Sequence, residues 1–299
     1  MNLGVDRVPQ ARKDKIRHWT KYWLQPVLTA LALAMPLLGA GEIYYQVFWF
    51  SLISLLTLLE ILIPARPGWQ ETFNAKLMVL GMVWIASMAG DLFEALFDES
   101  LFVWLSEVGE STGLHVWPDH WPVLAQALLL FFAYEFVNYW YHRAAHRWNW
   151  LWKASGHGTH HAFKSLTAIN TMANHPIEAL FLMLPRMLVG FVVGGEEVGL
   201  TVASLFAVTV FMAHCNLDLN SRIIGWFFTT NRYHIHHHSM VLDESNTNYG
   251  CSAIVWDRLF GTFSGASTLE AGTGPTEPTL WEKVVMPVRE PADTAIAPD

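Results

Sequence analysis

Four long apolar runs constrain the fold of this chain more than any other feature of its sequence. They lie at 24–41, 44–64, 77–97 and 120–141. The last run has 22 residues, and at a rise of about 1.5 Å per residue a helix of that length reaches roughly 33 Å, enough to cross a hydrocarbon core of about 30 Å. The runs predict an all-α integral membrane protein with about four transmembrane helices.

Two further apolar segments predict a second helical hairpin. They lie at 177–194 and 198–213 and flank the tight turn Gly194-Gly195-Glu196-Glu197. The first arm contains Pro185, which interrupts a helix because proline has no backbone N–H. The sequence leaves open whether this hairpin crosses the membrane or only enters it.

The composition agrees with a membrane protein and excludes several other classes. Hydrophobic residues make up 53% of the 299 residues and charged residues only 15%, whereas a soluble domain carries about 25% charged residues. No long basic tract is present, so we expect no nucleic-acid partner. The two cysteines, Cys215 and Cys251, show neither a metal-binding nor a secreted spacing, so any metal must be held by nitrogen or oxygen atoms.

The distribution of lysine and arginine predicts the orientation in the membrane. The N-terminal arm, 1–23, is basic, as are the loop at 65–76 and the segment that follows the fourth run. The loop between the third and fourth runs carries acidic residues and no lysine or arginine. Because short basic loops stay on the cytoplasmic side, the N-terminus is predicted to be cytoplasmic, in the inner membrane of a bacterium or the endoplasmic reticulum of a eukaryote.

Histidines are concentrated in the second half of the chain. Fourteen are present, and eleven of them lie between 142 and 238. Most belong to three boxes, HRAAH at 142–146, HGTHH at 157–161 and HIHHH at 234–238, while His175 and His214 flank the second hairpin. Residues three and four positions apart share a helix face, so HRAAH predicts a two-pronged clamp and each HxxHH a three-pronged one. The predicted topology places all eleven at the cytoplasmic face.

Such a set of imidazoles predicts a site for two metal ions. Imidazole suits iron, zinc, copper and nickel, so the ligand type alone does not choose among them. Nine or ten neutral nitrogens give each of two ions four or five ligands and leave open positions where O2 can bind. A two-zinc hydrolytic site usually includes carboxylate ligands, and this region has few. The lipid boundary indicates an apolar substrate.

These boxes, in this order, give the sequence a resemblance to a known family. Together with Asn248-Tyr249-Gly250 and the run WDRLFGT at 256–262, the region from about 133 to 263 resembles the fatty acid hydroxylase and sterol desaturase superfamily of membrane di-metal oxygenases. HPIE at 175–178 and HCN at 214–216 are similar to two further elements of that superfamily. The resemblance implies a helical bundle with a cytosolic histidine-rich cap, two iron ions, and oxidation of lipid or sterol C–H bonds by O2 with external electrons.

The resemblance also implies a set of site residues. The expected metal ligands are His142, His146, His157, His160, His161, His175, His214, His234, His237 and His238. His236 fills a variable position of the last box and is left out. Glu135 and Asn138 lie seven and four residues before His142 on one helix face, where they either orient a metal-bound imidazole or serve helix packing. Asp257 either accepts a hydrogen bond from a ligand histidine or caps the WDRLFGT segment.

The expected organisation is a basic cytosolic arm at 1–23, transmembrane helices 1–3 at 24–119, a catalytic domain at 120–263 and a C-terminal tail at 264–299. Because the sequence contains no haem or iron–sulfur domain, electrons are expected from a separate reductase acting with a ferredoxin or a cytochrome. Zinc is a possible substitute metal in purified protein. Hydroxylation is favoured over desaturation, which shares its first step; a zinc-dependent membrane hydrolase and a metal-binding transporter are the remaining alternatives.

Overall fold

A computed structural model describes residues 8–97, 101, 103–114, 117–192, 198–268 and 270–291. Every regular element in these ranges is helical, and a single antiparallel bridge pairs Ser239 with Ala271. The expectation of an all-α protein is therefore confirmed.

Three helices in the described ranges are long and apolar enough to cross a membrane: α3 (Glu42–Leu62), α4 (Phe73–Phe97) and α6 (Val123–Arg147). They coincide with the second, third and fourth predicted spans. Large apolar side chains on their outer faces are exposed, for example Phe50 at 76% and Trp84 at 65%. Side chains of this size cover the outside of a helical bundle when its surroundings are lipid and not water.

The first predicted run, 24–41, is divided and is not among these three helices. The helix α1 (Gln10–Trp19) continues through a π-helical turn (Thr20–Leu24) into α2 (Gln25–Ala34), and a 3₁₀ turn (Pro36–Leu38) follows. Proline is the physical cause at both ends, because a proline ring removes one helical hydrogen bond and collides with the carbonyl four residues earlier. Pro26 follows the π-helical turn and Pro36 follows the end of α2.

The second hairpin consists of α9 (Glu178–Val192) and α10 (Gly199–His214), and the turn expected at Gly194–Glu197 lies outside the described residues. With 15 and 16 residues, these helices reach roughly 23 Å, less than a hydrocarbon core of about 30 Å. They pack inside the bundle, with α9 against α4, α5 and α6, and α10 against α2, α3 and α6.

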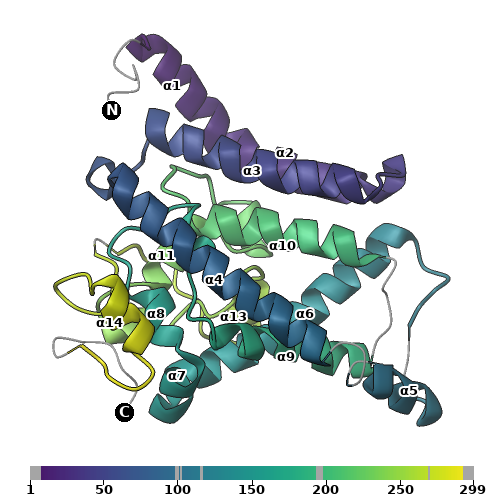
Figure 1. Ribbon diagram of the computed structural model, residues 1–299. Helices are drawn as coiled ribbons and strands as arrows, with labels where there is room; N and C mark the ends of the chain where they lie inside the picture. The colour runs from purple at the N-terminus through teal and green to yellow at the C-terminus, as the bar shows by residue number, and fades with distance from the viewer. Residues whose placement is uncertain are drawn as a thin grey trace.

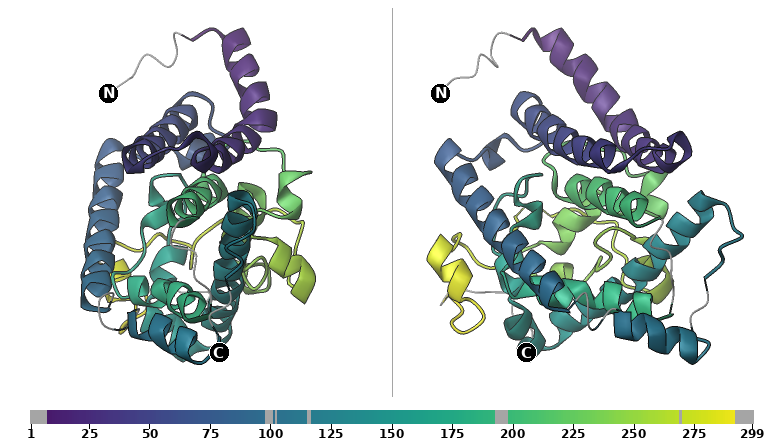
Figure 2. Two further views of the ribbon diagram at one scale, coloured as in Figure 1. Left: turned by 90° about the vertical axis from the view of Figure 1, so that its right-hand side faces the viewer. Right: turned by 45° about the vertical axis from the view of Figure 1, so that its right-hand side comes forward.

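Short helices gather at one end of the bundle and α5 (Val103–Ser111) lies toward the other (Figures 1 and 2). Within the region expected as a tail, α14 contacts α8, so this segment folds back onto the same end. The short elements are α7 (Asn149–Ser155), α8 (His157–His161), α11 (Asn231–His237), α12 (Leu242–Ser245), α13 (Val255–Phe260), α14 (Leu280–Val285) and the 3₁₀ turns Pro67–Trp69, Asn170–Met172 and Ile224–Trp226.

One buried carboxylate joins the membrane helices to this end. Glu60, near the end of α3, is 5% exposed. Its Oε1 atom accepts hydrogen bonds from the backbone N–H of Ala168 at 2.9 Å and of Asn216 at 2.8 Å. These two residues lie in the loops that follow α8 and α10, so a single side chain holds both loops to α3.

We predict that Glu60→Ala lowers the free energy of unfolding by about 2–5 kcal/mol, because two buried N–H groups lose their acceptor at roughly 1–3 kcal/mol each. Glu60→Gln keeps a carbonyl oxygen in place and loses much less. Thermal unfolding in detergent measures both. Glu42→Ala, at the exposed start of the same helix, is the control, and an equal loss in all three variants would contradict the assignment.

Candidate metal centre

Nine of the ten expected ligands lie in two buried clusters. The five-histidine cluster consists of His142, His146, His157, His161 and His237, and the four-histidine cluster of His160, His214, His234 and His238. Within each cluster the candidate donor atoms lie within 4.8 Å of one another. The clusters adjoin, because the rings of His161 and His238 stack with centroids 4.2 Å apart.

Each HxxHH box contributes to both clusters and does not form the single three-pronged clamp that we expected. In α8, His157 and His161 enter the five-histidine cluster, while His160 enters the four-histidine cluster. In the last box the division is reversed: His234 and His238 enter the four-histidine cluster, while His237 enters the five-histidine cluster. Helical geometry explains the split: positions i and i+4 differ by only about 40° around the axis, whereas positions i+3 and i+4 differ by about 100°. The two boxes therefore bridge the clusters.

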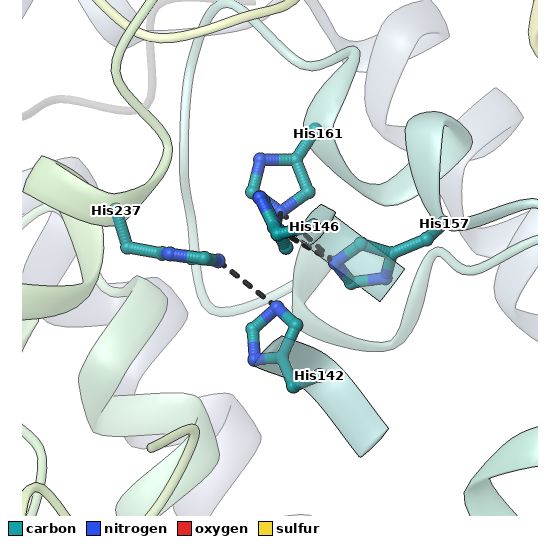
Figure 3. Close-up of side chains that lie close together, drawn as sticks. All are labelled: His142, His146, His157, His161 and His237. Atoms are coloured by element: carbon teal, nitrogen blue, oxygen red, sulfur yellow. Dashed lines mark hydrogen bonds between the residues drawn. The ribbon is translucent and has the colours of Figure 1, made fainter. Parts of the chain in front are cut away.

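The Nε2 atoms of the five-histidine cluster point toward one another (Figure 3). The distance between Nε2 atoms is 3.2 Å for His146 and His157, 3.1 Å for His146 and His161, and 3.1 Å for His157 and His161. The Nε2 atoms of His142 and His237 are 3.0 Å apart. Three helices thus bring their ring nitrogens to one point: the end of α6, α8 and α11.

Hydrogen bonds on the far side of the rings fix which nitrogen carries the proton. The Nδ1 of His142 donates to the carbonyl oxygen of Tyr249 at 2.6 Å, and the Nδ1 of His237 donates to that of Thr247 at 2.8 Å. A carbonyl only accepts, so in a neutral ring Nε2 carries a lone pair and no hydrogen. The two lone pairs face each other at 3.0 Å, an arrangement that a cation between them stabilises.

The four-histidine cluster repeats this arrangement. The Nδ1 of His214 donates to the carbonyl of Val210 at 3.0 Å, one helical turn earlier in α10. Its Nε2 lone pair lies 3.2 Å from Nε2 of His160 and 3.1 Å from Nε2 of His234, and the Nε2 atoms of His234 and His238 are 3.1 Å apart. Both clusters therefore present converging lone pairs.

The donor set fits two transition-metal ions. For metal–nitrogen bonds of about 2.1 Å, neighbouring nitrogens lie about 3.0 Å apart at 90° and about 3.4 Å apart at the tetrahedral angle. The distances of 3.0 Å between the Nε2 atoms of His142 and His237 and of 3.1 Å between those of His146 and His161 lie nearer the first value. Five candidate nitrogens also exceed the four ligands of a structural zinc site.

A carboxylate that sequence reasoning did not assign to the centre contacts one ligand directly. The Nδ1 of His157 lies 2.5 Å from Oε1 of Glu178, and both side chains are buried. Burial raises the pKa of Glu178 to about 8 and lowers the pKa of His157 to about 3, so without metal both groups are neutral. With an ion on Nε2, the ring donates Nδ1–H to the carboxylate, which orients the ring and raises its basicity. The signal was present in HPIE, whose last residue is Glu178.

The three expected supporting residues hold a loop and, within the described residues, form no hydrogen bond with an imidazole ring. Oε2 of Glu135 accepts from the backbone N–H of Ser252 and Ala253 at 2.7 and 2.8 Å, and Asn138 donates to Oε1 of Glu135 at 3.2 Å. Asp257 accepts from the backbone N–H of Tyr249 and Gly250 at 2.8 and 2.7 Å. The loop 249–253 carries the carbonyl that receives His142, so these carboxylates position that ring through the backbone.

Two histidines lie outside the clusters. His175, the tenth expected ligand, has its Nε2 atom 3.0 Å from the carbonyl oxygen of Val284, while its Nδ1 accepts from the N–H of Ile177 at 3.2 Å. The ring therefore holds the segment containing α14. Nε2 of His236 lies 3.1 Å from the hydroxyl of Ser264, in agreement with its omission from the ligand set.

Nine converging imidazoles at the end of an apolar helical bundle define a membrane protein of the histidine-box class with a candidate metal centre. The model of the family described as fatty acid hydroxylase matches residues 127–262. The chain is 34% identical over 229 residues to an ornithine lipid hydroxylase, OlsE, of Rhizobium tropici, covering 74% of this chain and 67% of the relative. No solved structure matches it significantly.

Two more distant relatives match about half of this chain. They are an alkylglycerol monooxygenase of Xenopus tropicalis, 30% identical over 45% of this chain and 30% of the relative, and methylsterol monooxygenase 2-1 of Arabidopsis thaliana, 28% identical over 50% of this chain and 60% of the relative. The chain thus spans less than two thirds of these two relatives. It belongs to the fatty acid hydroxylase family, as its histidine boxes predicted, and is a membrane protein.

We predict that Glu178→Gln weakens metal binding by about 10- to 100-fold, the usual effect of losing the carboxylate behind a ligand histidine. The amide still accepts a hydrogen bond from His157 but carries no charge. Competition with a chelator measures the affinity. Glu290→Gln is the control, because Glu290 pairs with Lys153 at 3.3 Å, away from both clusters; unchanged affinity in Glu178→Gln would contradict a role for this carboxylate.

We also predict that the metal-free protein loses stability as the pH falls from about 6.5 to about 4. Burial lowers the pKa of His157 to about 3 and of His214 to about 4, so in this range the unfolded chain binds protons that the folded chain does not. Each such imidazole costs up to about 1.4 kcal/mol per pH unit. Burial raises the pKa of Glu178, so this one group increases stability as the pH falls and partly offsets the loss from the histidines. Chemical unfolding at a series of pH values tests this, and a flat profile would contradict it.

Proposed function

We propose that this protein is a membrane-bound di-iron monooxygenase that hydroxylates a C–H bond of a lipid or sterol-like substrate. The observation that carries the proposal is the pair of adjoining clusters, in which nine buried imidazoles direct lone pairs at two points. Family membership supports it, because the relatives compared above are named as a hydroxylase and as monooxygenases.

The donor set favours redox chemistry over hydrolysis. The proposed ligands are the nine clustered histidines, all of them neutral nitrogen donors, and a hydrolytic zinc pair usually has carboxylates among its ligands. Two iron ions bound there would supply O2 activation: with two external electrons and two protons, one oxygen atom would enter a substrate C–H bond and the other would leave as water. The chain contributes fixed ring orientations: Tyr249, Thr247 and Val210 hold three rings by their carbonyls, and Glu178 holds a fourth.

The proposed centre faces the cytoplasm. Arg17 and Lys21, at the end of the basic N-terminal arm, line the same hollow as Arg232 of α11, so the arm and the last histidine box lie at one end of the bundle. Basic segments stay on the cytoplasmic side. A cytoplasmic centre can receive electrons from a separate reductase working with a ferredoxin or a cytochrome. Desaturation of the same substrate is the alternative outcome of hydrogen removal.

We predict that the iron-loaded protein, incubated with membrane lipids, a reductant and ¹⁸O2, yields a lipid that is heavier by one ¹⁸O atom. Mass spectrometry of the lipid extract detects it, and label from water should not enter. His214→Ala abolishes the product, because it removes a donor that faces two others of its cluster. A product that forms without O2 would support the hydrolase, and one lighter by two hydrogens would support the desaturase.

His236→Ala is the matched control for these ligand variants. This histidine lies in the same box but outside both clusters, so metal content and product should persist. His175→Ala decides the status of the tenth expected ligand: elemental analysis should show unchanged metal content if the ring only holds the segment at Val284. Loss of iron in His175→Ala and its retention in His214→Ala would overturn the proposed ligand set.

A further inference from the structure

A basic hollow lies beside the metal centre on the outer side of α11. It has a volume of about 950 Å³ and lies between the start of the π-helical turn, the loop that follows α3, the loop that follows α10, and α11. The charged side chains of its lining are Arg17, Lys21, Arg66, Arg222, Arg232 and Asp218. Five cations against one carboxylate give the lining a strong positive charge.

Most of this charge is available to a ligand. The single carboxylate of the lining, Asp218, pairs with Lys21 at 2.7 Å, and Arg17 pairs with Asp14, outside the lining, at 3.6 Å. The other three cations of the lining are Arg66, Arg222 and Arg232. Among the described residues, no carboxylate forms an ion pair with any of them. Arg66 lies over the ring of Trp69 at 4.5 Å, and Arg232 donates one N–H to the carbonyl of Gly265. Each guanidinium has five N–H donors, so several of them can reach an anion.

An apolar groove meets this hollow at Thr20, which lines both. The groove has a volume of about 520 Å³ and lies between the first helical segment and α3. Apart from Lys15 and Thr20 its lining is apolar: Ile16, Trp19, Leu24, Val27, Leu28, Leu31, Leu55 and Leu59. The combined surface thus changes from cationic at the end of the bundle to apolar along the helices.

We propose that the hollow and the groove together bind one anionic membrane lipid, with its phosphate or carboxylate head group among the arginines and an acyl chain in the groove. Guanidinium groups bind phosphate and carboxylate through paired hydrogen bonds, and basic clusters at the cytoplasmic surface attract anionic lipids. A soluble anion would use the hollow alone and would leave the groove unexplained. An exposed apolar side chain also lies beside the hollow: Ile223, next to Arg222, is 81% exposed.

The position of this site gives the lipid a structural role. Asn231, Arg232 and Ile235 line the hollow from α11, whereas His234 and His237 of the same helix enter the two clusters. The lipid head group therefore lies against the side of α11 that faces away from the metal ions. Lipid binding at this site does not require the proposed hydroxylation.

The test uses the full-length protein reconstituted in vesicles of equimolar phosphatidylglycerol and phosphatidylcholine, extracted in a neutral detergent, with the retained lipids measured by mass spectrometry. The wild-type protein should retain phosphatidylglycerol in preference to phosphatidylcholine. Arg66→Gln and Arg222→Gln should each reduce that preference about fivefold, the effect of removing one basic contact near a membrane surface. Val27→Trp, which fills the groove and leaves the charge intact, should reduce it as well.

Arg12→Gln is the matched control, because Arg12 is an exposed cation of α1 that does not line the hollow. An equal effect of Arg12→Gln would reduce the preference to general surface charge and overturn the proposal. Displacement of the lipid by inorganic phosphate alone, with no effect of Val27→Trp, would overturn it in favour of a soluble anion. If Arg66→Gln and Arg222→Gln retain phosphatidylglycerol as the wild-type protein does, but an electron-donor protein reduces their metal centre more slowly, the proposal is overturned in favour of a protein-docking surface. Unchanged metal content in every variant shows that the chain is folded.

Discussion

The structure depends on the approach of imidazole lone pairs to one another in the interior of the protein. His142 and His237 each use Nδ1 to donate to a backbone carbonyl, and their Nε2 atoms then face each other at 3.0 Å. Without a cation this contact is repulsive and both rings are removed from water, so the arrangement costs free energy twice. Ion binding reverses the sign of the contact, which makes metal binding part of the folding free energy of this end of the molecule.

Irregular backbone surrounds the centre, and buried carboxylates hold it in place. Glu60 receives two backbone N–H groups from the loops after α8 and α10, Glu135 receives two from the loop at 252–253, and Asp257 receives two from residues 249 and 250. Each carboxylate replaces water as acceptor for N–H groups that no helix satisfies. Glu178 does the same for a ring nitrogen. The rings of His142 and His157 are therefore oriented by acceptors on other elements of the chain.

The sequence predicted those features that depend on local periodicity and failed where proline or tertiary contacts decide. Apolar length identified α3, α4 and α6 to within a few residues, and the three boxes together with His214 identified the ligand candidates that the structure brings together. The run at 24–41 was predicted as one span, but Pro26 and Pro36 interrupt it. Spacing did not reveal how each HxxHH box divides between the two clusters, because that depends on where the second cluster lies. His175 was predicted as a ligand because it is a histidine in the right region of the chain. Its Nε2 atom instead lies beside the carbonyl oxygen of Val284, more than a hundred residues away, and spacing could not reveal that contact.

The way α6 crosses the bundle explains why a centre of this kind suits an apolar substrate. Its first residues continue the apolar core through Leu130 and Phe131, and its last two turns carry His142 and His146. One continuous helix therefore runs from the hydrocarbon region to the ligands, over a rise of about 1.5 Å per residue. A lipid chain that lies along such a helix reaches the histidine clusters without leaving the membrane, whereas a water-soluble substrate gains nothing from this placement. The position of the ligands at the end of a spanning helix, more than their number, distinguishes a site for lipid oxidation from a metal site in a soluble protein.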